Sequence, residues 1–141
     1  MSDDTNHFTG RCHCGSVSFE VTLPAGLDET LRCTCSICSM RGAVLVFSDL
    51  SQFRITSGED CLTSYRFNTN SAAHYFCSRC GVYTHHQRRL DPTQYAINAA
   101  CLDGVSPYDF EAVRVLDGAN HPLDNDGQVR FAGTMRFDKS D

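Results

Sequence analysis

Seven of the nine cysteines fall into three short clusters, and these clusters constrain the fold more than any other feature of the sequence. The densest cluster holds Cys33, Cys35 and Cys38, with no obvious fourth ligand beside them. Thiolate sulfur selects zinc, cuprous copper or an iron–sulfur cluster, and a zinc with three protein ligands keeps one position for water or substrate. In an extended segment Cys33 and Cys35 point to the same side, and a tight turn returns Cys38 to them. The sequence therefore predicts a metal site that the protein leaves incomplete.

The two remaining clusters are cysteine pairs that together offer four thiolates. Their members are Cys12, Cys14, Cys77 and Cys80. Each pair is followed by a glycine, Gly15 or Gly81, which accepts positive φ and lets backbone N–H groups approach the sulfurs. A metal crosslink between pairs so far apart in the chain is worth ~4 kcal/mol as an upper guide. These residues predict a closed, four-coordinate structural zinc.

Two other arrangements remain open from the sequence. In the first, Cys12 and Cys14 join two of the central cysteines, and Cys77 and Cys80 take one cysteine and a histidine such as His85. In the second, both zincs are structural and a histidine completes the central site. The candidates for that histidine are His74, His85, His86 and His121. We favour the division into four and three because it keeps each local cluster whole.

Composition and charge narrow the class of protein. A chain of 141 residues with 41% hydrophobic and 21% charged residues is typical of a globular domain. The net charge of −5 and pI near 5.6 argue against nucleic acid or an anionic membrane as a partner. We expect a cytoplasmic protein because no secretory signal or long apolar run is visible, and in a reducing compartment cysteines serve metals rather than disulfides. We expect a flexible leader over residues 1–9 and one zinc-binding domain over residues 10–141, and the sequence gives no oligomeric state.

The apolar pattern predicts a mainly β fold. Alternation at Val17, Phe19 and Val21 indicates a half-buried strand, and residues 48–52 suit one helical turn capped by Ser48 or Asp49. Turn signals separate the other predicted strands. These strands cover residues 43–47, 53–56, 61–67, 73–76, 82–86, 95–102, 113–116 and 129–131.

The central cluster also indicates a class of chemistry. A zinc held by three thiolates carries a net −1 charge, and its open position suits a thiol that arrives as thiolate. A bound thiolate is the nucleophile that adds to an aldehyde carbon, so we expect a carbon–sulfur bond to be formed or cleaved. Arg32 and Arg41 lie close enough in the sequence to attract the carboxylates of an anionic thiol.

The three cysteine motifs resemble those of the glutathione-dependent formaldehyde-activating enzyme family, which includes centromere protein V. The motifs are GRCHCGSV at residues 10–17, CTCSIC at residues 33–38 and YFCSRCG at residues 75–81. The resemblance runs from about Gly10 to Asp103, and Ser57-Gly58-Glu59 with Tyr65 is a weaker echo of it.

The resemblance implies an Mss4-like fold, the β-tent, built from curled antiparallel sheets with zinc knuckles. It implies two zinc ions per chain, a structural one on Cys12, Cys14, Cys77 and Cys80 and a catalytic one on Cys33, Cys35 and Cys38. It also implies a carbon–sulfur lyase that condenses glutathione, or a related thiol, with formaldehyde or a similar aldehyde to S-hydroxymethylglutathione. The alternatives are a non-catalytic zinc scaffold that binds a protein partner and a thiol carrier without turnover.

Several residues are interpreted as structural. Cys61 and Cys101 are expected to be small buried residues, and Asp103 to be a turn residue that the family echo brings close to the site. We expect His85 and His86 to be surface residues on opposite faces of one strand. The remaining four are Arg88 and Arg89, read as solvated, and Tyr65 and Phe67, read as core aromatics.

Overall fold

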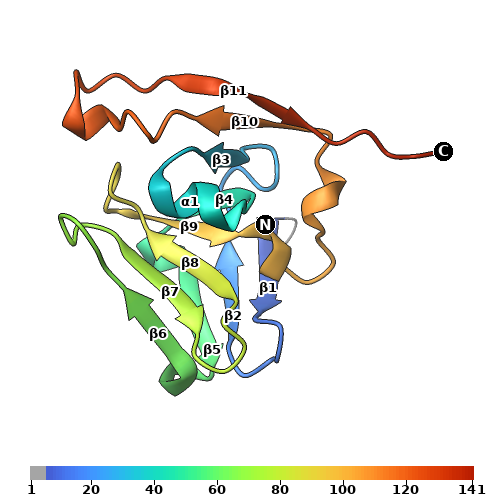
Figure 1. The fold of residues 1–141 in the computed structure, drawn as a ribbon. Helices are drawn as coiled ribbons and strands as arrows, with labels where there is room; N and C mark the ends of the chain where they lie inside the picture. The colour runs from blue at the N-terminus through green and yellow to red at the C-terminus, as the bar shows by residue number, and fades with distance from the viewer. Residues whose placement is uncertain (1–5) are drawn as a thin grey trace.

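Strands dominate the computed structural model, which describes residues 6–141 (Figure 1). The small sheet has three strands in the order β1 (His7–Arg11), β2 (Ser18–Thr22) and β5 (Phe53–Ser57). The large sheet has eight strands in the order β11 (Phe131–Arg136), β10 (Ala112–Leu116), β3 (Leu31–Cys33), β4 (Leu45–Asp49), β9 (Gln94–Asn98), β8 (Tyr83–Gln87), β7 (Ala73–Cys77) and β6 (Leu62–Tyr65). Within these sheets every neighbouring pair is antiparallel except β10 and β3, which run parallel. Figure 1 shows the large sheet curling from β6 round to β11, which confirms the expected class of fold.

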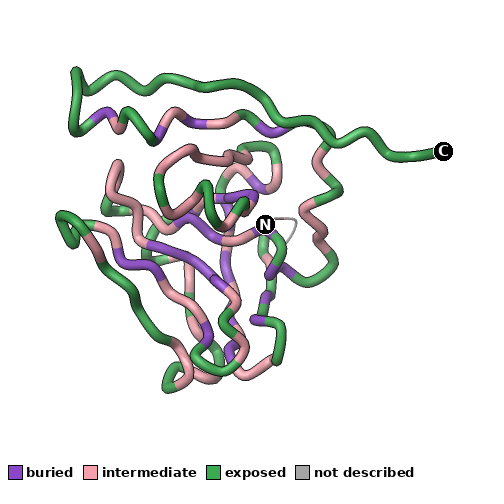
Figure 2. The backbone as a smooth tube through the Cα atoms, viewed as in Figure 1, coloured by how far each residue is buried: buried purple, intermediate pink, exposed green. Residues whose placement is uncertain are grey.

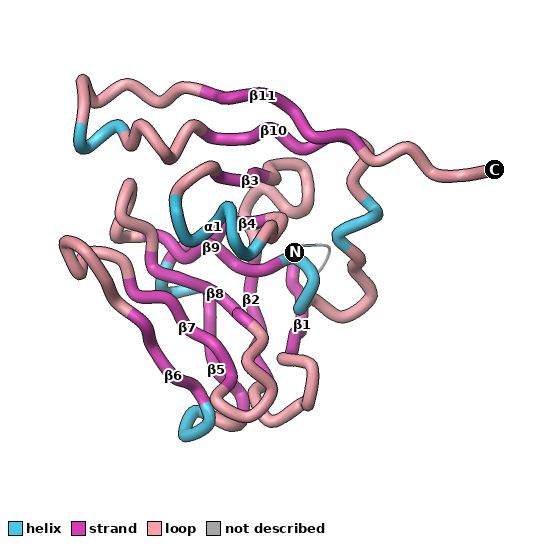
Figure 3. The backbone as a smooth tube through the Cα atoms, viewed as in Figure 1, coloured by secondary structure: helices cyan, strands magenta, loops and turns pink. Residues whose placement is uncertain are grey.

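The helical segments are short and connect strands (Figure 3). They are α1 (Ser36–Arg41) and the 3-10 turns η2 (Leu50–Gln52), η3 (Glu59–Cys61), η4 (Ala99–Cys101), η5 (Pro107–Asp109) and η6 (Pro122–Asp124). Across residues 6–141 no helix has the length and apolar character needed to cross a bilayer.

The main core lies between the two sheets. The predicted alternation in β2 is confirmed, because Val17, Phe19 and Val21 are buried while the residues between them are partly exposed. Phe19 and Val21 pack with Val46 of β4 and Ile97 of β9 in one hydrophobic cluster, whereas Val17 packs with Cys12 and Cys77 in another. This packing fixes the small sheet against the strands that carry the cysteine clusters.

Two of the predicted elements are confirmed, and the helical turn has one of its two predicted capping residues, Asp49. The predicted turn after β4 is η2, where the backbone N–H of Asp49 donates to the side chain of Gln52 at 2.8 Å. The buried strand predicted at residues 43–47 is β4, in which Leu45 and Val46 are buried. Local signals sufficed here because each element is complete within a few residues.

Several boundaries differ from the prediction, and three of them differ most. Residues 7–9 were placed in a flexible leader, but they belong to β1, where Phe8 pairs with Val21 of β2. The rest of that leader, up to residue 5, lies outside the described residues. The strand predicted over residues 95–102 ends at Asn98, whose side chain accepts a hydrogen bond from Ala100 N and caps η4. The last strand lies further along than residues 129–131, because pairing with β10 sets it at Phe131–Arg136.

Strand β8 is buried on both faces, which corrects the expectation for its histidines. His85 is 2% exposed and His86 is 8% exposed, so neither is a surface residue. The ring of His85 stacks on Tyr75 at 4.7 Å between centroids and lies 4.2 Å from the Phe53 ring. Figure 2 shows buried backbone along β8 in the middle of the molecule. Neighbouring residues of a strand face opposite ways, as predicted for this pair: His85 packs against Tyr75 and Phe53, whereas His86 packs against His74.

Candidate metal centres and cavity

The four cysteines of the two pairs gather at one end of the small sheet. Cys12 directly follows β1, and Cys77 is the last residue of β7. A glycine N–H closes each turn, since Gly15 N donates to Cys12 O, three residues earlier, and Gly81 N donates to Cys77 O, four residues earlier. The φ angles of these glycines are 78° and 77°, as their place after each pair predicts.

The four sulfur atoms have the spacing of a tetrahedral ion site. All four lie within 4.8 Å of one another, and Cys14 Sγ lies 3.7 Å from both Cys12 Sγ and Cys77 Sγ. An ion about 2.3 Å from each sulfur places two sulfurs about 3.8 Å apart, so the donor set fits zinc. Val17 N–H donates to Cys12 Sγ at 3.3 Å and helps to hold it. Hydrogen bonding with Ser16, with its side chain first and its backbone second, lowers the pKa of the Cys14 thiol to about 6, which favours the thiolate.

The central three cysteines converge around the start of α1. Cys33 ends β3, Cys35 caps α1, and Cys38 lies in the first turn of α1, where a tight turn had been predicted. Their sulfurs lie within 4.8 Å of one another. Cys35 N donates to Cys33 Sγ and Cys38 N donates to Cys35 Sγ, each at 3.4 Å. The side chains of Cys33 and Cys38 stabilise the Cys35 thiolate and lower its pKa to about 2.

The grouping into four and three is the one expected from the sequence, and all nine cysteines are free. Within residues 6–141 no histidine, aspartate or glutamate ligand atom joins the three sulfurs of the trio within 4.8 Å. Cys101 is buried, as expected, and Cys61 is half-buried; neither belongs to a cluster. Both clusters offer a soft donor set that can hold zinc.

Gly118 covers the trio, and sequence reasoning did not identify it. A Cβ atom at this buried position would lie 2.2 Å from Cys33 Sγ and 3.0 Å from the Cys35 backbone nitrogen. The segment after β10 is fastened to the trio by Thr34, whose backbone N–H donates to Leu116 O and whose hydroxyl accepts from Ala119 N. The sequence signal at this position is the dipeptide Asp117-Gly118, which is typical of a turn and indicates no contact with the trio.

The trio lines a cavity of about 480 Å3. Its wall includes the three cysteines and side chains from several strands. Among these are Arg32, Phe67, His74, His86, Arg88, Arg89, Gly118, His121 and Asp124. The cavity has the size of ordinary small-molecule sites, which occupy about 300–1,000 Å3.

The two arginines predicted to meet a carboxylate have different places. Arg32 lines the cavity, and its Nη1 donates to Gly42 O while its Nε is buried without a hydrogen-bond partner among residues 6–141. Arg41 is absent from the cavity wall. Its Nη2 contacts His74 Nδ1 at 2.7 Å, and its guanidinium lies 3.8 Å from the centre of the Tyr83 ring. The structure therefore does not place Arg41 where a substrate carboxylate would bind, because His74 and Tyr83 hold its side chain.

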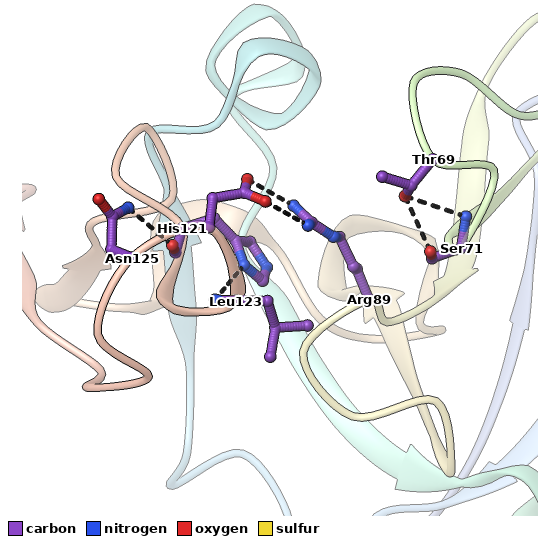
Figure 4. A network of polar contacts seen from close by, with 7 residues as sticks. Thr69, Ser71, Arg89, His121, Leu123 and Asn125 are labelled. Atoms are coloured by element: carbon purple, nitrogen blue, oxygen red, sulfur yellow. Dashed lines mark hydrogen bonds and ion pairs between the residues drawn. The ribbon is translucent and has the colours of Figure 1, made fainter.

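The sequence predicts that Arg88 and Arg89 are solvated, but in the structure both are half-buried. Arg88 lines the cavity, donates to Gln94 at 2.8 Å and lies over the Phe47 ring. Burial lowers its pKa. Among residues 6–141 it forms no ion pair with a carboxylate. Arg89 forms a two-bond ion pair with Asp124 of η6, at 2.5 and 2.8 Å (Figure 4).

Of the other residues interpreted from the sequence, one lines the cavity and the others lie away from it. Phe67 lines the cavity, whereas Tyr65 is 51% exposed, so neither is a core aromatic. Asp103 accepts a hydrogen bond from Thr9 at 2.7 Å and lies 4.0 Å from Arg11. It therefore orders the turn beside β1 and is absent from the cavity wall.

Comparison with known proteins agrees with this geometry. Residues 7–114 match the family described as glutathione-dependent formaldehyde-activating enzyme. A crystal structure of a Rhodobacter sphaeroides protein is 48% identical in sequence and superposes with a TM-score of 0.70, covering 72% of this chain and 93% of that chain. The family match over residues 7–114 includes all seven clustered cysteines, while Gly118, His121 and Asp124 lie beyond it. The chain therefore belongs to the glutathione-dependent formaldehyde-activating enzyme family.

Proposed function

We propose that this protein is a zinc-dependent carbon–sulfur lyase that joins glutathione, or a related anionic thiol, to formaldehyde or a similar small aldehyde. The observation that carries the proposal is the trio of sulfurs, which lines a cavity and has no fourth protein ligand within 4.8 Å among residues 6–141. Family membership supports glutathione and formaldehyde as the substrates. In this proposal Cys12, Cys14, Cys77 and Cys80 hold a structural zinc.

Cys33, Cys35 and Cys38 would hold the second zinc, which supplies an open position that acidifies and orients a thiol. The protein then has to bind the rest of the thiol and bring the aldehyde carbon to its sulfur. A fixed sulfur beside the aldehyde carbon makes the addition effectively unimolecular. Gly118 keeps one side of the trio closed, so both substrates approach from the cavity.

Arg88 is the residue best placed to hold a carboxylate of the thiol. It is half-buried, lines the cavity and forms no ion pair within the described residues, and the more distant Asp91 carboxylate only partly offsets the lowering of its pKa by burial. A buried cation without a partner gains most from an incoming anion. Arg32, with its unpartnered Nε, is the second candidate. Arg89 is already occupied by Asp124 and shapes the wall instead.

A location in the cytoplasm is part of this proposal. The nine free cysteines suit a reducing compartment, in which a thiol substrate also stays reduced. A non-catalytic scaffold would be expected to have four protein ligands at both metals, because structural zinc sites are closed. The trio supplies three protein ligands within the described residues. The carrier alternative shares the site and differs only in turnover.

The experiment measures metal content and catalysis on the same preparation. We expect two zinc ions per chain, a cobalt-substituted spectrum that changes when glutathione is added, and hemithioacetal formation faster than the spontaneous reaction. Arg88→Gln should weaken glutathione binding by roughly 10-fold or more, the cost of losing a charged hydrogen bond. Arg54→Gln is the matched control, because exposed Arg54 pairs with Glu20 and is absent from the cavity wall.

Two results would decide against the proposal. Stoichiometric thiol binding with no rate above the spontaneous reaction would indicate a carrier. Neither binding nor rate would leave the scaffold.

A further inference from the structure

Four polar side chains contact one another beside the cavity, three of them buried and Arg41 half-buried, and the proposed function assigns a role to none of them. His74 of β7 and His86 of β8 stack with 4.7 Å between ring centroids. Arg41 contacts His74 Nδ1 at 2.7 Å, and Tyr83 Oη contacts His86 Nδ1 at 2.6 Å. Both histidines also line the cavity beside the trio.

The partner at each Nδ1 fixes the tautomer of the ring. A guanidinium can only donate, so Nδ1 of His74 accepts from Arg41 and the ring proton lies on Nε2. The Tyr83 hydroxyl has two acceptors in reach, His86 Nδ1 at 2.6 Å and Ala96 O at 3.4 Å. The shorter contact takes its proton, which leaves the His86 proton on Nε2 as well. Both rings therefore present an Nε2–H donor.

Both histidines are neutral at pH 7. Burial, and then the nearby Arg41 charge, lower the pKa of His74 to about 4. Burial, followed by the charges of His74 and Arg41, lowers the pKa of His86 well below its usual value. The Arg88 charge also lowers the pKa of His86. The Cys35 charge acts in the opposite direction and raises the pKa of both histidines. A neutral imidazole remains a hydrogen-bond donor and polarises a carbonyl without giving up its proton.

The two donors are free to meet a ligand. Across residues 6–141 the hydrogen bonds of His74 and His86 involve Nδ1, and none involves Nε2. The buried polar side-chain atoms without a partner in that range are Arg32 Nε, Arg41 Nη1 and Ser48 Oγ. Neither Nε2 atom is among them, so both keep contact with the cavity.

We propose that His74 and His86 are catalytic residues whose Nε2–H groups donate hydrogen bonds to the aldehyde oxygen as the thiol sulfur adds to the carbon. This inference rests on the proposed function. The sulfur electron pair forms the C–S bond and the C=O π pair moves to oxygen. That oxygen takes up, through water, the proton that the thiol released. The histidines change no protonation state, and Arg41 and Tyr83 are positioning residues for them.

The test compares variants that keep or remove a donor at the same place. His→Gln at position 74 or 86 keeps an N–H group near Nε2, whereas His→Leu removes it. We expect the Leu variants to lower kcat about 100-fold, as removal of an oxyanion donor does, with the glutathione Kd within about threefold of wild type. The Gln variants should recover most of that loss. His7→Leu, an exposed change on β1, is the control.

A second readout needs no catalysis. Nitrogen-15 imidazole shifts at pH 7, assigned by the loss of signals in the two Gln variants, should show neutral Nε2–H tautomers at His74 and His86. Signals of a cation or an Nδ1–H tautomer would overturn the inference, as would Leu variants with wild-type kcat. A wild-type rate equal to the spontaneous one would instead refute the proposed function, and this inference with it.

Discussion

Gly118→Ala should remove the metal from the trio and leave the four-cysteine site intact. The added Cβ would lie 2.2 Å from Cys33 Sγ, whereas non-bonded atoms of this size rest about 3.5–4.0 Å apart. Cys33 or the loop therefore has to move by more than about 1 Å, and metal–ligand distances tolerate only about 0.2 Å. We expect metal content to fall from two ions to one. The same overlap should lower the free energy of unfolding by about 1–3 kcal/mol.

The assay is metal content per chain after gel filtration, read beside urea unfolding and glutathione binding. Gly133→Ala is the matched control, because a Cβ at this exposed position of β11 meets no atom within 4 Å. Gly118→Ala protein with two ions and wild-type glutathione affinity would refute the assignment of Gly118 as the cover of the trio. Loss of both ions would show instead that the two sites are coupled.

Three further changes test other parts of the structure. Cys14→Ser should lower the unfolding midpoint sharply because it opens the crosslink between the two pairs, whereas Cys35→Ser should lose one ion and keep the fold; equal effects would contradict the separate roles. Cys101→Ala should keep both ions and cost about 1 kcal/mol in unfolding free energy, since it only removes a buried sulfur. Burial lowers the pKa of His85 to about 3, so between about pH 6.5 and 3 the unfolded chain binds more protons than the folded one. The free energy of unfolding therefore decreases as the pH is lowered through this range, by up to about 1.4 kcal/mol per pH unit. In urea titrations His85→Phe should remove this contribution to the slope and leave those of His74 and His86, and an unchanged slope would contradict the assignment.

The cysteine clusters could be predicted because their ligands are close together in the sequence. Spacing alone brings Cys33, Cys35 and Cys38 together, and a glycine after each pair marks a turn of positive φ. The strands with clear alternation, such as β2, were predicted for the same reason. A period of two survives wherever one face is buried.

The wall of the cavity could not be predicted in this way. His74 and His86 meet because β7 and β8 pair in one register, and their burial depends on strands on both sides. Arg88 and Arg89 looked like a solvated pair, since nothing local shows that β9 and η6 pack beside them. Arg41 was assigned to the substrate because it follows the trio closely, but α1 directs it to His74.

The two sets of sulfur ligands follow from the amino-acid sequence alone, because ligand type and spacing are local properties that survive any arrangement of the sheets. The surroundings of the trio depend instead on how the strands and loops pack in three dimensions. Gly118 closes one side, Arg88 remains without a carboxylate partner among the described residues, and two histidines offer free N–H groups. These contacts join residues far apart in the chain, so strand register and packing create them and no short motif records them.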